Sequence, residues 1–173
     1  MLLDIQDYMS KAIRGDVTVS PGNLKLFVEE SRQAIEKQFG GRKREYRVRM
    51  SGLGKPLCQQ ILDKLGIEEA MEYNSIARFA FGDLTEALLM LVMREAGIDI
   101  VASQKEVELK LADITVKGTL DVVIRGNDGV ERVWDIKSAS DWAFKNKFTG
   151  MGGYEHIKND DPFGYVMQGH LYG

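Results

Sequence analysis

Apolar residues recur at helical spacing through the first part of the chain, where they predict three helices. The first helix covers about residues 23–39 and is ended by Gly40-Gly41. The second is short and amphipathic and stops at Gly66, and the third covers about residues 76–97. We therefore expect the first part of the chain to be helical.

The pattern changes to strict alternation from Ala102 onward, which is typical of strands. Two further strands are expected at about residues 115–125 and 130–138, joined by a Gly-Asn-Asp-Gly turn. After a Gly-rich loop, the segment DDPFGYVMQGHLY predicts a helix with Asp161 as its cap and Pro162 at its first position. The order of elements predicts a mixed α/β (α+β) fold, an antiparallel meander flanked by helices.

The composition of the chain limits the classes of protein to which it can belong. At 173 residues, 44% hydrophobic and 28% charged, the chain fits one globular domain. No apolar run is long enough to cross a bilayer, and the first residues lack a signal-peptide pattern, so we expect no membrane association. Cys58 is the only cysteine, which excludes an internal disulfide or an iron–sulfur cluster held by thiolates and favours a cytoplasmic location.

The charge of the chain is compatible with an enzyme that acts on nucleic acid. The formal net charge of −3 argues against a protein that coats nucleic acid non-specifically. A nuclease needs acidic metal ligands and only a local basic patch, and the segment GRKREYRVR, which includes Arg42 and Arg44, offers one. The alternative is that this run is a solvated charged face.

Two predicted neighbouring strands each carry an aspartate, and the second carries a lysine two residues later. Alternation places Asp135 and Lys137 on one face of their strand. A three-residue loop at 127–129, with Gly129 in the left-handed conformation, puts Asp121 directly opposite Asp135, whereas a two-residue loop sends them to opposite faces. We expect the three-residue loop.

Carboxylates opposite one another repel, so a paired arrangement needs neutralising charge. Their β-carbons are expected roughly 4.5–5.5 Å apart. Lys137 supplies one positive charge, and Mg²⁺ or Mn²⁺, which prefer oxygen ligands, can supply the rest. The alternative is that Asp121 and Asp135 sit at strand ends and face water.

Glu86 is the only charged residue between Asp83 and Arg94 on the long predicted helix. The following ALLMLVM leaves no polar face, and a helix that is apolar all round is expected to be buried. A buried carboxylate is costly unless it is paired or metal-bound, so Glu86 is a candidate third ligand. The alternative is a glutamate at the rim of the helix that touches solvent.

A helix acid, a strand aspartate and Asp-x-Lys on the next strand resemble the PD-(D/E)xK nuclease superfamily. The matching residues are Glu86, Asp121 and Asp135-Ile136-Lys137. Gln168 and Tyr172 add a Q-x-x-x-Y motif similar to that of the RecB-like and lambda-exonuclease-like branches, and their spacing of four puts both on one helix face.

The resemblance covers about residues 76–172 and implies a restriction-endonuclease-like core with a central mixed sheet. On this basis residues 76–173 form the nuclease core, and residues 1–75 form a helical and basic N-terminal extension. The chain ends directly after the Q-x-x-x-Y helix, where relatives usually continue. We expect either a minimal or truncated member, or a sheet completed by something else.

Three departures refine the resemblance. Leu120 replaces the proline that names the motif. Glu86 stands where many RecB-like members have a histidine, which favours the lambda-exonuclease-like or other phage exonucleases. The cysteines of iron–sulfur relatives are missing, so no such cluster is expected.

The resemblance implies a metal-dependent DNA exonuclease of phage recombination or repair type. One or two Mg²⁺ or Mn²⁺ ions are expected on Glu86, Asp121, Asp135 and the Ile136 carbonyl. Lys137 is expected to orient the attacking water or to counter developing negative charge. Other DNA contacts are expected from a loop of interleaved aromatic and basic residues and from the motif helix, at Trp142, Lys145, Lys147, Gln168 and Tyr172. The alternative for the loop is that its rings fill the core.

Two rival functions remain. One is a DNA endonuclease, either structure-specific or restriction-like. The other is a DNA-binding or scaffold module that keeps the nuclease fold without turnover. For an exonuclease of the phage type, the expected partners besides DNA are a single-strand-annealing protein, a recombinase or a helicase.

Overall fold

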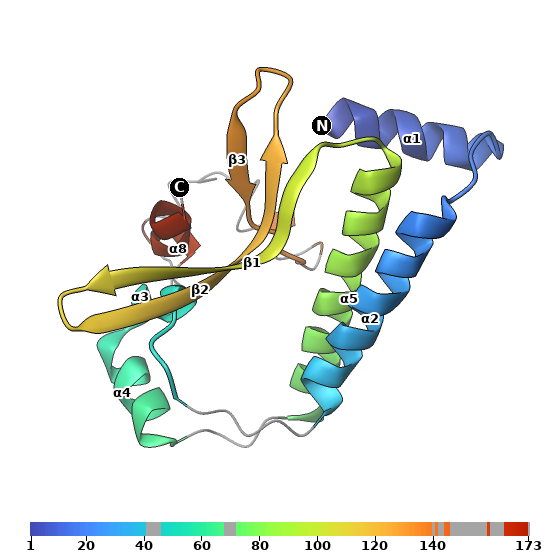
Figure 1. The fold of residues 1–173 in the computed structure, drawn as a ribbon. Helices are drawn as coiled ribbons and strands as arrows, with labels where there is room; N and C mark the ends of the chain where they lie inside the picture. The colour runs from blue at the N-terminus through green and yellow to red at the C-terminus, as the bar shows by residue number, and fades with distance from the viewer. Residues whose placement is uncertain are drawn as a thin grey trace.

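The computed structural model describes residues 1–40, 46–67, 72–139, 141, 144–145, 159 and 165–172. Within them the chain is mixed α/β, a three-stranded antiparallel sheet with flanking helices (Figure 1). This confirms the expected meander and helices. No helix in these ranges is long and apolar enough to cross a membrane.

Two helices open the chain. Helix α1 spans Leu2–Arg14 and was not predicted from the sequence. Helix α2 spans Pro21–Phe39, which confirms the helix expected at 23–39. Its start is fixed by Ser20, whose hydroxyl accepts a hydrogen bond from the backbone N–H of Asn23, as capping serines do.

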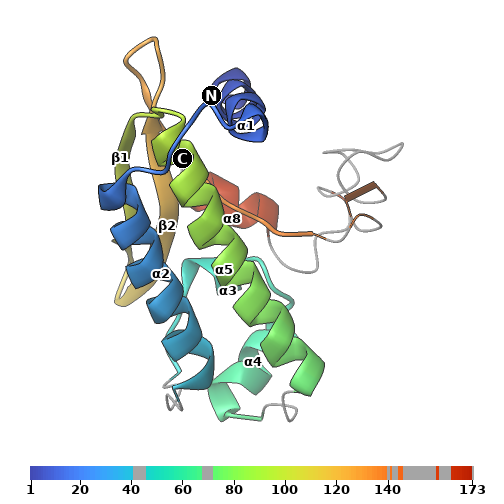
Figure 2. The same cartoon turned by 90° about the vertical axis from the view of Figure 1, so that its right-hand side faces the viewer.

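Three more helices lie between α2 and the sheet in the described part of the chain. Helix α3 spans Met50–Leu53, and α4 spans Leu57–Leu65 and ends at the predicted Gly66 in the left-handed conformation. Helix α5 spans Tyr73–Glu95, and its α2 neighbour runs beside it in both views (Figures 1 and 2). The α2–α5 pair forms one wall of the molecule, and the sheet lies against it.

The sheet order is β1-β2-β3, with β1 at Ile100–Leu111, β2 at Ile114–Arg125 and β3 at Glu131–Trp134. The third strand was predicted to continue to residue 138, and this prediction is wrong. The ladder stops because the Ile136 backbone N–H donates to the Asp121 carboxylate, 2.8 Å away, instead of to a β2 carbonyl.

The hairpin register is the predicted one. Val122 pairs with Trp134, and the Gly126 N–H donates to the Val130 carbonyl at 2.9 Å. Gly129 has a φ of 75°, the left-handed conformation that a three-residue loop needs. Continuing this register by one residue sets Asp135 opposite Asp121, although Asp135 already lies beyond the end of β3.

The core lies between α5 and one face of β2. Met90 and Met93 of α5 pack on Val122 and Ile124 of β2, and all four are buried. The expectation that α5 is buried all round is wrong, because Leu88 is 52% exposed. The core therefore does not cover the whole surface of the helix.

Helix α8 spans Tyr165–Tyr172 and packs on α3, and its Tyr172 lies next to Gly118 of β2. The predicted start of this helix, with Asp161 and Pro162, lies outside the described residues. Gly118 of β2 makes the close approach possible, because a β-carbon there would lie 2.7 Å from the Met50 sulfur and 2.9 Å from the Tyr172 hydroxyl.

Replacing Gly118 by alanine is therefore expected to destabilise the protein by roughly 1–3 kcal/mol, since the added methyl group overpacks the contact between β2, α3 and α8. Gly169 is the matched control. A β-carbon there meets nothing within 4 Å, and Gly169→Ala in helix α8 should stabilise the protein by about 1 kcal/mol. Urea unfolding measures both; equal effects of the two substitutions would contradict the packing.

Candidate active site

Asp121 is the centre of the candidate site. It lies on β2, half-buried, and its Oδ2 accepts the hydrogen bond from the Ile136 backbone N–H. On the β1 side, the pairs Ser103–Val122 and Lys105–Leu120 bracket Gln104, which stands opposite Asp121. Gln104 has a φ of 48°, a conformation that non-glycine residues seldom adopt. The strand is therefore distorted where it meets the acid.

Asp135 adjoins Asp121 on the other side. The Lys137 Nζ lies 3.0 Å from its Oδ1 and 2.9 Å from its Oδ2, and the Gln168 amide nitrogen donates to Oδ1 at 3.2 Å. The negative charge of Asp135 also raises the pKa of Asp121. Asp135 thus stands between two donors and a second carboxylate, as the sequence pattern predicts for a paired site.

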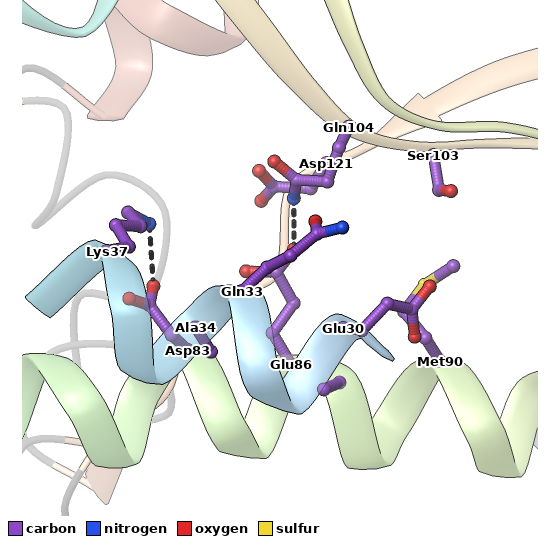
Figure 3. Close-up of a pocket in the computed structure, with 11 residues that line it drawn as sticks. Glu30, Gln33, Ala34, Lys37, Asp83, Glu86, Met90, Ser103, Gln104 and Asp121 are labelled. Carbon is purple, nitrogen blue, oxygen red and sulfur yellow. Dashed lines mark hydrogen bonds and ion pairs between the residues drawn. The ribbon is translucent and has the colours of Figure 1, made fainter. Parts of the chain in front are cut away.

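Glu86 reaches the site from α5. Its carboxylate accepts a hydrogen bond from the Gln104 amide, and Glu86 and Asp121 line one pocket of about 130 Å³ between α2, α5 and the sheet (Figure 3). Lys37 of α2 lies at the same pocket and pairs with Asp83, Nζ to Oδ1, at 2.8 Å. The helix carboxylate therefore faces the sheet acids and not open solvent alone.

Burial and charge repulsion shift the pKa values of the acids at the site. Burial, together with the negative charge of Asp121, raises the pKa of Glu86 to about 7. Burial also raises the pKa of Asp121, and Asp135 adds repulsion, while the Ile136 N–H acts in the opposite direction. Acids whose charged forms are disfavoured in this way gain most from a nearby cation.

The motif helix α8 contributes two further residues to the site, Gln168 and Tyr172. Gln168 is only 8% exposed, and its amide holds Asp135. The Tyr172 hydroxyl hydrogen-bonds the Thr119 backbone and the Gln168 side chain, and burial raises the Tyr172 pKa. Both residues of the Q-x-x-x-Y motif therefore lie beside the acids that the motif resemblance associates with them.

The residues predicted to contact DNA include members of the aromatic and basic loop and of the segment GRKREYRVR. Trp142, Lys147, Arg42 and Arg44 lie outside the described residues. Lys145 is exposed and pairs with Asp141 at 2.8 Å. Its contact with DNA stays a prediction.

The three acids offer carboxylate oxygens, which suit a hard divalent cation. Among the described residues, no three His, Cys, Asp or Glu side chains lie close enough to hold one metal ion. The acids meet in two pairs, Glu86 with Asp121 across the pocket and Asp121 with Asp135. Gln104, the Ile136 N–H and Lys137 each hold one of the three carboxylates in its present position.

Two residues of the site were not predicted. Gln104 holds Glu86 from a left-handed position in β1, and nothing in an alternating strand pattern indicates such a position. Lys37 reaches the pocket because α2 packs on α5, a contact between segments far apart in the chain. A charge on a predicted helix carries no sign of that neighbour.

Comparisons of the chain with protein-family models, with curated protein sequences and with solved structures returned no match. The function of the site is therefore argued from its residues and their geometry.

In the metal-free protein, the raised Glu86 pKa makes stability fall as pH rises. The folded state binds the proton more tightly, so stability is fully present below pH 4.5 and is lost as pH rises through about 7. Glu86→Gln should flatten this fall, which urea unfolding at pH 5 and pH 8 with a chelator measures.

Glu29→Gln is the control for that measurement. Hydrogen bonds from Arg32 and Gln33 lower the Glu29 pKa to about 2, so its contribution is present above pH 4.5 and is lost only as pH falls toward 2. This variant should keep the wild-type slope between pH 5 and pH 8. A wild-type slope in Glu86→Gln as well would contradict the assigned burial.

Proposed function

We propose that the chain is a metal-dependent DNA nuclease of the PD-(D/E)xK kind, and in its leading form an exonuclease. The observation that carries the proposal is the position of Asp121 between two other carboxylates. Glu86 shares its pocket, and Asp135, just past the end of β3, raises its pKa by charge repulsion and is paired with Lys137. Carboxylates gathered beside a lysine suit the binding of a divalent cation that assists phosphodiester hydrolysis.

The order of elements supports a restriction-endonuclease-like core. An acid-bearing helix, α5, is followed by the β1–β3 meander and by the Q-x-x-x-Y helix, α8. Glu86 on α5, Asp121 on β2 and the Asp135-Ile136-Lys137 triplet just after β3 follow one another in the order of the superfamily motif. Glu86 in the place where many RecB-like members have a histidine favours the lambda-exonuclease-like branch, with DNA as substrate, and the single cysteine favours a cytoplasmic location.

Each residue has a role in this proposal. Glu86, Asp121, Asp135 and the Ile136 carbonyl hold one or two Mg²⁺ or Mn²⁺ ions, which lower the pKa of bound water and neutralise phosphate charge. Lys137, already 2.9 Å from Asp135, orients the attacking water or counters the charge that develops on the phosphate. Gln168 and Tyr172 position Asp135 and the strand that carries Asp121.

Binding a shared cation requires a local rearrangement. Gln104 has to release Glu86, and Glu86 has to ionise, before the helix acid can join the two aspartates. The cation offsets the burial and repulsion that raise the pKa values of Glu86 and Asp121. Metal binding and a small movement of the Gln104 side chain are therefore coupled in this proposal.

The test is hydrolysis of end-labelled linear DNA and of closed circular DNA with Mg²⁺ or Mn²⁺. We expect loss of label from linear ends, and a fall of about 10²-fold or more in Asp121→Ala and Lys137→Ala, the size typical of a removed catalytic group. Asp128→Ala, on the tip of the same hairpin and paired with Arg132, is the matched control and should keep the activity.

The outcomes separate the rival functions. Nicking of closed circles favours the endonuclease. DNA binding without metal-dependent cleavage favours the scaffold and contradicts the nuclease. Equal activity in Asp121→Ala and Asp128→Ala would place the chemistry elsewhere.

Metal should also stabilise the fold. A cation bound only by the folded protein adds about 2.7 kcal/mol at a hundred times its dissociation constant. Thermal unfolding with and without Mn²⁺ should show this gain in the wild type and in Asp128→Asn, and little of it in Asp121→Asn. The idea fails if all three proteins respond alike.

A further inference from the structure

A second pocket, of about 460 Å³, lies between the segment before α3 and helix α4. Its size falls in the range of pockets that bind small molecules or nucleotides. Arg47, Arg49 and Lys55 line it from one side, and Lys64 and Asp63 from α4. Tyr46, 48% exposed, stands at the same pocket. None of these residues belongs to the acidic site.

The charge of this pocket is unlike that of the chain. Four cationic side chains and one carboxylate give its lining a formal charge of +3 (four minus one), whereas the whole chain carries −3. Such a local excess of positive charge attracts an anion to the pocket.

Three of the four pocket cations also lack a carboxylate partner among the described residues. Elsewhere in the described ranges, many Lys and Arg side chains hold a carboxylate, as Arg94 does with Glu30. Of the pocket cations only Lys55 has one, Asp63, at a distance of 3.5 Å between Nζ and Oδ2. No described carboxylate forms an ion pair with Arg47, Arg49 or Lys64. An anionic ligand is the partner that would neutralise them.

The pocket and the acidic site share one edge of β2. The Lys117 N–H donates to the Val48 carbonyl at 3.2 Å, and Arg49 forms a parallel bridge with Lys117. Four residues further along the same strand, about 13 Å at roughly 3.3 Å per residue, lies Asp121. Tyr172 covers Gly118 between the two places. A strand of nucleic acid that follows this edge can reach both.

We propose that this basic pocket binds the backbone of single-stranded DNA, with the phosphate at Arg47, Arg49 and Lys64 and a base stacked on Tyr46. A hollow with an aromatic ring suits an unpaired nucleotide, whereas the phosphates of a duplex lie on a convex surface. The pocket deepens the proposed function by naming the strand form that it holds. Its binding role does not depend on cleavage.

The test is binding of a fluorescent oligo-dT, measured by anisotropy with the full chain in a chelator, so that no hydrolysis is needed. Arg49→Glu and Lys64→Glu should each weaken binding about tenfold and make the salt dependence shallower by about 0.7 per lost phosphate contact. Tyr46→Ala should weaken it by about tenfold as well. Lys25→Glu, an exposed cation on α2, is the matched control and should bind as the wild type does.

The result that supports the pocket is a preference of the wild type for the oligo-dT over a duplex of the same length, lost in Arg49→Glu and Lys64→Glu. Urea unfolding of each variant shows that it is folded. No binding by the wild type, an equal or greater affinity for the duplex, or an equal effect of Lys25→Glu overturns the proposal.

The pocket and the nuclease can fail separately. Asp121→Asn should lose cleavage and keep its affinity for oligo-dT. Binding at the pocket without any cleavage by the wild type contradicts the nuclease alone. Cleavage by a wild type whose oligo-dT binding ignores Arg49 and Lys64 contradicts the pocket alone.

Discussion

The hydrogen bond from the Ile136 backbone N–H to the Asp121 carboxylate decides how the site is built. It uses a backbone donor that would otherwise extend the β2–β3 ladder, so β3 ends at Trp134. The chain that leaves the strand then carries Asp135 and Lys137 beside Asp121 instead of along the sheet. Because charge-assisted hydrogen bonds are stronger than neutral ones, one carboxylate can both end a strand and anchor the residues that follow it.

Several hydrogen-bonding side chains together offset the repulsion between the carboxylates of the site. Lys137 and Gln168 hold Asp135, and Gln104 holds Glu86. Gln104 does so from a left-handed backbone conformation in the middle of a strand, which costs of the order of 1–3 kcal/mol and persists only where its surroundings require it. Strain at this position and a raised Glu86 pKa both indicate that the arrangement is not optimised for stability alone.

Sequence rules that act within the hairpin predicted the pairing of the two aspartates, whereas tertiary packing determines the other features of the site. The Asp121–Asp135 register follows from loop length and from Gly129, both of which act within the hairpin. The end of β3 and the strained Gln104 depend on side-chain bonds across the sheet, which no alternation pattern encodes. The exposure of Leu88 was missed because an apolar helix does not specify how many of its sides are covered.

Charge is separated along the edge of β2 in a way that suits an anionic polymer. Asp121 and its neighbouring acids repel phosphate, so a nucleic acid gains nothing from approaching them without a cation. In the proposed binding mode, the pocket with Arg47, Arg49 and Lys64 attracts phosphate, and its Arg49 bridges Lys117 on the strand that carries Asp121. In this proposal, attraction at the basic pocket holds a strand near the acids, where a divalent cation bound at Asp121 would neutralise the phosphate charge.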